Sequence, residues 1–175
     1  SRFLEFLSLE GAEPFVGVIE AVPNPTSRAR EGERLAPEPA FPIRLRGAAV
    51  FRRDRLVGFL DEAEARGLLW VLNEVKGGQI AFPTPGGKPG DKATVEILRA
   101  RGEIRPAIEN GRIVMKVKIL EEGNLAEVEG VCDVSKPEVM RELERANAAA
   151  IRQEVMAAAH RTQELGADAF GFGEA

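Results

Sequence analysis

The chain has 175 residues, of which 44% are hydrophobic and 30% are charged, and its formal net charge is −4 at pH 7. This composition is typical of a globular protein and excludes an intrinsically disordered chain. The negative charge disfavours nucleic-acid binding, because neutralising phosphates requires a basic surface. The single cysteine, Cys132, excludes an internal disulfide, and no apolar run is long enough to span a bilayer. Because the sequence begins with Ser1 and not with a methionine, we expect a fragment of a longer protein.

The N-terminal part combines apolar segments with a proline-rich stretch. Arg2–Leu9 predicts a short helix, and the β-branched residues of Phe15–Val22 predict a strand. Five prolines with charges between them make Pro23–Pro42 an exposed, extended connection. We expect residues 1–175 to form one domain, with residues 1–12 as a candidate lead-in from a preceding domain.

The stretch Gly47–Trp70 predicts a β-hairpin that leads directly into a helix. Val50 and Phe51 end one strand, Arg52–Arg55 form a polar turn, and Leu56–Leu60 form the second strand.

The helix that follows this hairpin is predicted from its cap and its apolar stripe. Asp61 occupies the N-cap position, and the glutamates of the first turn complement the helix dipole. The helix is expected to run to about Asn73. Gly67 costs a helix about 1 kcal/mol relative to alanine, which predicts either a close packing contact or an early break at this position.

The central region predicts a short strand and a long hairpin. Gln79–Phe82 is the short strand, and Pro83–Asp91 is a loop rich in glycine and proline. Lys92–Glu109 and Arg112–Glu129 are two long strands joined by Asn110-Gly111, the dipeptide favoured in type I′ turns.

Alternation along this long hairpin predicts that one of its faces is buried. The inward positions of the two arms are expected to be Val95, Ile97, Ile104, Ile108, Ile113, Met115, Val117 and Ile119. Arms of this length are expected to bend, with bulges at Gly102 and Gly123.

A long helix and a glycine-aromatic tail complete the chain. Ser135 and Glu138 predict a capping box, the helix runs to about Leu165, and Gly166 ends it as the C′ residue. The two phenylalanines of the tail are expected to dock on the body. The fold class predicted is α+β, a largely antiparallel (mixed) sheet with helices packed on one face, including the long C-terminal helix.

The sequence contains no convincing catalytic constellation. His160 is the only histidine, and the four serines lie at a terminus, in a linker or at a helix cap, so a hydrolase is disfavoured. Cys132 has no second thiol and is expected to be a buried small residue. One histidine and one cysteine do not make an ordinary transition-metal site, and no cofactor is predicted.

Two further patterns are better explained by structure than by ligand binding. Asp61, Glu62 and Glu64 are favoured as capping residues over a cation site, because calcium loops space their oxygen ligands along a turn. Gly86–Lys92 lacks the Ser or Thr and the following helix of a phosphate-binding loop, and a surface loop is the better interpretation.

A local basic cluster contrasts with the acidity of the whole chain. Arg52, Arg53 and Arg55 lie in the first hairpin turn, with Arg44 and Arg46 on the preceding strand. Either this is a solvated hairpin tip, or it contacts an acidic partner or anionic lipid headgroups.

Three segments resemble, in order, the Ger(x)C family, the C subunits of bacterial spore germinant receptors. The matching residues are Gly47–Phe51 (GAAVF), Asp54–Asp61 (DRLVGFLD), Glu64 and Arg66–Trp70 (RGLLW), then Asn124–Glu129 (NLAEVE), and finally Gly166–Gly173 (GADAFGFG). The resemblance covers most of Phe15–Gly173 but not Pro23–Pro42 or Pro83–Asp91.

The resemblance implies a lipoprotein on the outer face of the spore inner membrane, required for the response to small nutrients. It implies two partners, a polytopic A subunit and a transporter-like B subunit, and membrane attachment only through an N-terminal lipid anchor absent from this chain. It brings no catalytic residue and no cofactor.

We therefore expect a soluble, non-enzymatic domain that acts by protein–protein interaction, with direct binding of a small germinant as the alternative. The expected partner contacts are Arg52, Arg53, Asp54 and Arg55 in the hairpin turn and Phe170 and Phe172 in the tail. For the same residues, maintenance of the fold is the competing interpretation.

Overall fold

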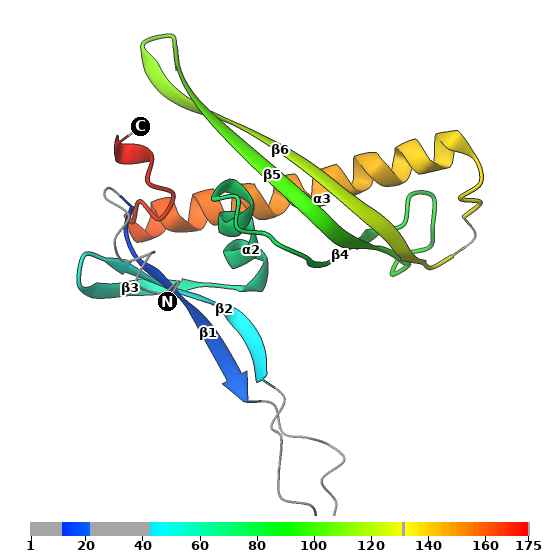
Figure 1. Ribbon diagram of the computed structural model, residues 1–175, viewed down its shortest axis with the longest axis horizontal. Coiled ribbons are helices and arrows are strands. Elements are labelled where there is room, and N and C mark those ends of the chain that lie inside the picture. Colours follow the sequence, from blue (N-terminus) through cyan, green and yellow to red (C-terminus); the bar gives the residue numbers. More distant parts are fainter. Residues whose placement is uncertain (1–11, 22–42, 131, 175) are drawn as a thin grey trace, which may run out of the picture.

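The computed structural model describes residues 12–21, 43–130 and 132–174 (Figure 1). In chain order the elements are β1 (Phe15–Ala21), β2 (Ile43–Arg52), β3 (Arg55–Leu60), α2 (Glu62–Val71), β4 (Gly78–Pro83), β5 (Lys92–Glu109), β6 (Arg112–Val128), α3 (Pro137–Leu165) and a 3₁₀ helix at Phe172–Glu174. The helix predicted at Arg2–Leu9 and the connection predicted at Pro23–Pro42 lie outside the described residues.

The described strands form two antiparallel sheets, in the orders β1-β2-β3 and β4-β5-β6. The predicted α+β class with a long C-terminal helix is confirmed, although the strands make two sheets where one was expected. The helices join the sheets, since α3 contacts both β3 and β4, and α2 contacts both β2 and β5. Figure 1 shows α3 running along both sheets, with α2 beside it.

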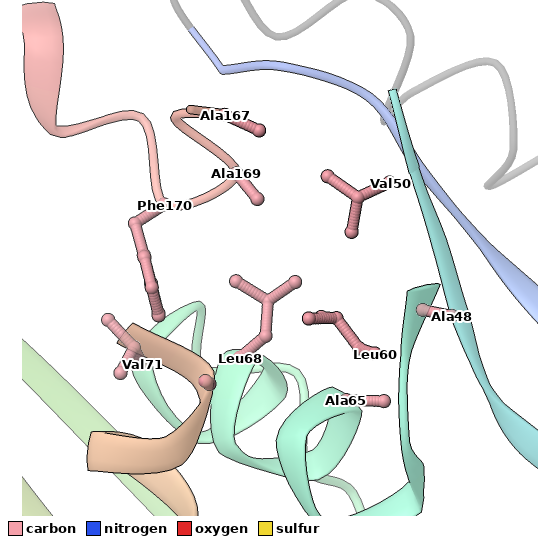
Figure 2. Close-up of a cluster of buried hydrophobic side chains, with 10 residues drawn as sticks. Ala48, Val50, Leu60, Ala65, Leu68, Val71, Ala167, Ala169 and Phe170 are labelled. Carbon is pink, nitrogen blue, oxygen red and sulfur yellow. The ribbon is translucent and has the colours of Figure 1, made fainter. Parts of the chain in front are cut away.

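One hydrophobic cluster lies between the first sheet, α2 and the C-terminal tail. Figure 2 shows Leu68 at its centre, with Val50 and Leu60 from the sheet on one side and Phe170 from the tail on the other. Leu68 and Val50 are fully buried. Burying side chains of this size contributes about 1.5–3 kcal/mol each, so this cluster anchors the predicted hairpin to its helix.

A second cluster lies between the second sheet and α3. Its largest member is Trp70 of α2, which is only 1% exposed and packs with Ile80, Ile97 and Ile151. The single helix α2 therefore supplies buried residues to both clusters, and it holds the two sheets together.

The β5–β6 ribbon departs from the predicted burial at its tip. Val95 and Ile97 are buried as expected, but Ile108 and Ile113 are 80% and 78% exposed. The prediction for these two isoleucines was wrong because the ribbon continues past the helix that covers its base (Figure 1).

The two predicted bulge positions have different roles. The register between β5 and β6 shifts between Ile97 and Arg99, next to the pairing of Ile97 with Gly123, so this bulge was correctly placed. Gly102 instead pairs regularly with Ile119 and lies against the end of α2, where its N–H donates to Asn73 Oδ1 at 3.0 Å.

The caps of the two helices differ in how well the sequence predicted them. Asp61 and Glu64 form the full capping box of α2. The capping box predicted for α3 was wrong: its N-cap is Lys136, without a side-chain bond, because the Ser135 hydroxyl donates to Asp133 Oδ1 at 2.6 Å instead. Gly166 ends α3 in the left-handed conformation, as expected.

Candidate interaction surfaces

The β2–β3 turn presents three arginines without acidic partners among the described residues. Arg52, Arg53 and Arg55 are exposed, and with Asp54 and Val57 they border a hollow of about 600 Å³. Arg53 adopts a positive φ of 56°, which the tight turn requires. Guanidinium groups that are not already paired are suited to binding carboxylates or phosphates.

The rest of the predicted basic cluster is separate from this turn. Arg44 pairs with Glu62 at 3.2 Å, and Arg46 pairs with Glu20 at 3.2 Å. Both lie toward the start of β2, whereas the turn follows its end. Of the five arginines in the predicted cluster, two are therefore neutralised and three have no acidic partner within the part of the chain that the structure describes.

The tail phenylalanines lie against the body of the protein, as the sequence predicted. Phe170 is 8% exposed within the first hydrophobic cluster, and its ring stacks on Phe172 with centroids 5.0 Å apart. Asp168 fixes the tail, because its carboxylate accepts hydrogen bonds from the N–H groups of Phe172 and Gly173. Partner contact through Phe170 and Phe172 stays a prediction, confined to the parts of these rings that face an adjacent groove.

That groove lies between β6 and α3 and has a volume of about 1030 Å³. Its apolar lining includes Met115, Val117 and Ile119 from β6 and Val155 and Met156 from α3. No pattern in the sequence predicted the groove. The alternation along β6 indicated an apolar face but not the distance between that face and α3.

A polar pair interrupts the apolar lining of the groove. Asn147 Nδ2 donates to Glu121 Oε2 at 2.8 Å, while Glu121 Oε1 and Asn147 Oδ1 are buried without a partner among the described residues. Burial raises the pKa of the Glu121 carboxyl above its usual value, because the charged form loses hydration.

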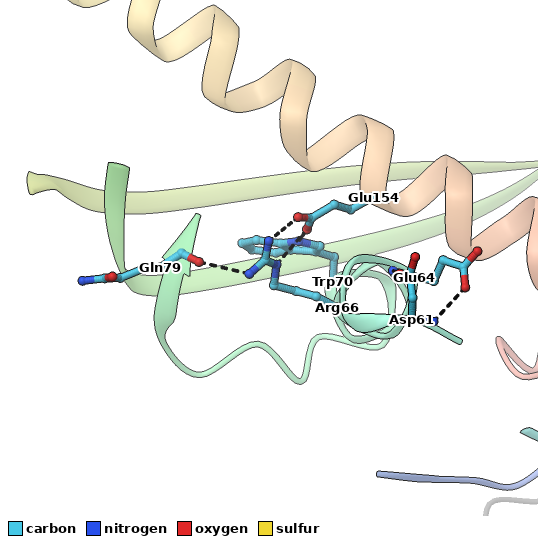
Figure 3. Close-up of polar contacts among 6 residues, drawn as sticks. All are labelled: Asp61, Glu64, Arg66, Trp70, Gln79 and Glu154. Atoms are coloured by element: carbon cyan, nitrogen blue, oxygen red, sulfur yellow. Dashed lines mark hydrogen bonds and ion pairs between the residues drawn. The ribbon is translucent and has the colours of Figure 1, made fainter. Parts of the chain in front are cut away.

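A second polar cluster, also missed by the sequence analysis, joins α2 to α3 (Figure 3). Glu154 of α3 accepts hydrogen bonds from Arg66 Nε and Trp70 Nε1, both at 2.9 Å, and also pairs with Arg66 Nη2. Arg66 Nη1 donates to the Gln79 carbonyl at 3.0 Å. The hydrogen bond with Glu154 raises the pKa of Arg66. Each of the three guanidinium nitrogens of Arg66 and the indole nitrogen of Trp70 has a partner, so this cluster acts as a structural lock.

The chemistry-bearing residues considered from the sequence do not assemble into a reactive site. His160 is exposed on α3, and Cys132 is partly buried beside the second cluster. Across residues 12–21, 43–130 and 132–174, no three His, Cys, Asp or Glu side chains are grouped to hold a metal ion. In the same ranges, neither helix combines the length and apolarity that crossing a bilayer requires.

Comparison with known proteins gives consistent matches. The family described as "Spore germination B3/ GerAC like, C-terminal" matches residues 46–175. The putative spore germination protein YfkR of Bacillus subtilis (strain 168) is 23% identical over 172 residues, covering 98% of this chain and 42% of that protein. Spore germination protein B3 of the same organism is 36% identical over 83 residues, covering 46% of this chain and 21% of B3.

A solved structure supports the same assignment. The crystal structure of the GerBC protein matches with a TM-score of 0.64 and 25% sequence identity, over 76% of this chain and 41% of that one. The chain thus spans less than half the length of each of these relatives. It belongs to the family described as "Spore germination B3/ GerAC like, C-terminal", which confirms the resemblance to the Ger(x)C family.

Proposed function

We propose that the chain is the C-terminal domain of a germinant-receptor C-subunit lipoprotein and that it acts by protein–protein contact with the A and B membrane subunits. The full-length protein would be lipid-anchored on the outer face of the spore inner membrane and required for the response to small nutrients. No catalytic step is part of this proposal.

The observation that carries the proposal is the unpaired β2–β3 turn. The protein is acidic overall, and elsewhere many of its cations are held in ion pairs, such as Arg44–Glu62 and Arg99–Glu122. Three arginines on one turn that have no acidic partner among the described residues favour an external anionic partner, because binding it breaks no ion pair that the structure describes.

The test is charge reversal of the turn in the full-length protein. Arg52→Glu, Arg53→Glu and Arg55→Glu together should reduce co-purification of the A and B subunits and weaken germination. The matched control reverses three exposed cations elsewhere, Lys88, Arg141 and Arg145, and should leave both unchanged. Normal co-purification and germination of the turn variant at wild-type protein level would contradict a role for this surface.

The domain's own contribution needs a separate comparison. Co-purification of the receptor subunits with and without this domain should differ if the domain mediates assembly. Equal recovery of the A and B subunits in both cases would refute the proposed function, whatever the turn variant does.

Direct binding of a small germinant is the second candidate, favoured by the groove between β6 and α3. An apolar cleft of about 1030 Å³ with a converging polar pair has the size and lining of a ligand site. Calorimetric titration of candidate nutrients should then release or absorb heat, and Asn147→Leu should abolish the signal. No heat across the panel would exclude this candidate.

A further inference from the structure

Strand β6 leaves one long edge of the second sheet open. It pairs with β5 on one side only, and among the described residues no strand lies on its other side. Figure 1 shows this edge running from the body of the protein to the projecting tip of the ribbon. An open edge of this kind presents unpaired backbone donors and acceptors, which can accept a further strand.

The turn geometry identifies which backbone groups point outward. Asn110 and Gly111 have φ values of 52° and 74°, so they form a two-residue type I′ turn closed by the hydrogen-bonded pair of Glu109 and Arg112. Hydrogen-bonded pairs then recur at every second residue. The backbone groups at the alternate positions, from Ile113 to Ile119, therefore point away from β5.

A proline in the partner strand supports this assignment. Pro106 pairs with Met115, one of the outward-pointing positions. Proline has no N–H to donate, so it fits a ladder position at which the N–H is directed away from the partner strand. The backbone N–H and C=O of Met115, which point away from β5, thus remain available at the open edge.

The two faces of this edge differ in character. The side chains of Ile113, Met115, Val117 and Ile119 line the groove above α3. The opposite face carries Arg112, Lys116 and Lys118 together with Val114, and residues 112–119 include no acidic residue. On β5, Glu109 pairs with Lys116 at 2.6 Å and Glu103 lies across from Lys118, so the outer side of these lysines is what a further strand would meet. A strand placed beside β6 would thus meet apolar side chains on one face and cations on the other.

A second copy of the same strand fits this edge poorly. Pairing β6 with β6 would bring Lys116 and Lys118 of the two copies together, and like charges directly across a sheet are destabilising. Lysines on edge strands are a known protection against such self-pairing. An acidic partner strand would instead convert the same lysines into attractive contacts.

We propose that the open edge of β6, from Arg112 to Leu120, binds an extended segment of a partner protein in which apolar and acidic residues alternate. The apolar residues of that segment lie in the groove, and its acidic residues lie beside the lysines. This inference rests on the proposed function as an interaction domain and adds a surface and a partner chemistry to it.

The test uses a capped nine-residue peptide of alternating glutamate and valine, titrated into the 175-residue chain. Amide hydrogen exchange measured by NMR should slow at Ile113, Met115 and Val117, whose N–H groups gain acceptors. Exchange at Val114, Lys116 and Lys118 should change little, because these N–H groups already bond to β5. Equal protection of both sets, or of neither, would overturn the proposal.

Two control peptides separate strand addition from charge attraction. In one control, two adjacent central residues are replaced by proline. Whichever way the peptide aligns, one of the two prolines then stands where an N–H should bond to β6, so the protection should be abolished. Replacing every glutamate by lysine should also abolish it. Binding of either control as tight as that of the original peptide would refute the proposed mode.

Variants of the chain provide the matching test. Lys116→Glu with Lys118→Glu should weaken peptide binding at least about fivefold, given typical cross-strand charge pairs. Arg141→Glu with Arg145→Glu makes the same change in net charge on α3 and should have little effect. Equal weakening by both variants would show a general charge effect and contradict the site.

The outcomes distinguish this inference from the proposed function. If the peptide does not protect β6 while removal of the domain still prevents co-purification of the receptor subunits, the edge proposal fails and the function stands. If the peptide protects the outward amides but the domain is dispensable for co-purification, the function fails. Protection that appears with rising protein concentration alone would assign the edge to a second copy and overturn the proposal.

Discussion

Replacing Gly67 by alanine should destabilise the protein, whereas helix propensity alone would predict that it becomes more stable. Gly67 lies in α2, where alanine is favoured over glycine by about 1 kcal/mol. In the structure, however, a Cβ at this position would lie far closer than 3.0 Å to the backbone carbonyl of Glu154 in α3, and 3.0 Å from the Cβ of Ala158. A backbone carbonyl cannot rotate away as a flexible side chain can, so the two helices must separate.

The expected cost follows from what that separation disturbs. Overpacking a buried contact costs about 1–3 kcal/mol. Moving α3 away from α2 also stretches the hydrogen bonds from Trp70 and Arg66 to Glu154, and bonds to charged groups contribute about 1.5–3 kcal/mol. After subtracting the propensity gain of about 1 kcal/mol, we expect Gly67→Ala to lower the free energy of unfolding by about 3 kcal/mol.

Urea denaturation followed by tryptophan fluorescence measures this directly, because Trp70 is the only tryptophan and is fully buried beside the contact. Ala63→Gly provides the control on the exposed side of the same helix and should cost less than the interior propensity difference of about 1 kcal/mol, because Ala63 lies in the first turn. A Gly67→Ala protein that is as stable as the wild type, or more stable, would refute the close-packing argument.

Three further predictions concern single side chains. Glu154→Gln should lower the free energy of unfolding by about 2–3 kcal/mol in urea denaturation, because the amide nitrogen then faces the donors of Arg66 or Trp70; an unchanged midpoint would contradict the structural lock. Asp61→Ala should cost about 1 kcal/mol through loss of the capping box, and amide exchange in the first turn of α2 should accelerate. The raised pKa of Glu121 means that its contribution to stability is fully present below the usual glutamate pKa of about 4.3 and is lost as the pH rises through the raised value. As the pH rises above about 4.3, the free energy of unfolding of the wild type should therefore fall relative to that of Glu121→Gln. If the free energies of unfolding of the two proteins change in parallel with pH, the effect is excluded.

The elements that the sequence predicted correctly are those set by neighbouring residues. The turn at Asn110-Gly111, the cap at Asp61 and the helix end at Gly166 each depend on interactions within a few residues. Local rules therefore predict them without knowledge of the tertiary structure. Ser135 marks the limit of such rules, because a nearby acceptor, Asp133, competes for its hydroxyl.

The features that the sequence did not predict depend on distant residues. Glu154 is 88 positions from Arg66 and 84 from Trp70, so no local pattern connects them. The exposure of Ile108 and Ile113 depends on where the covering helix lies, which alternation along a strand cannot indicate. The groove and its polar pair likewise arise only when β6 and α3 are placed together.

The segment that identifies the family is therefore mostly a folding unit. Of the residues in Gly47–Trp70, Leu60, Leu68 and Trp70 are buried, and Asp61 caps α2. Side chains that are used inside the fold cannot also contact a partner. What this segment leaves exposed is chiefly the turn Arg52–Arg55, with the half-exposed side chains of Leu56 and Phe59 beside it. The second cationic surface, the edge of β6, lies outside the segment altogether. Since both surfaces are basic on an acidic protein, each would select a partner by negative charge, and both should bind less tightly as salt concentration rises.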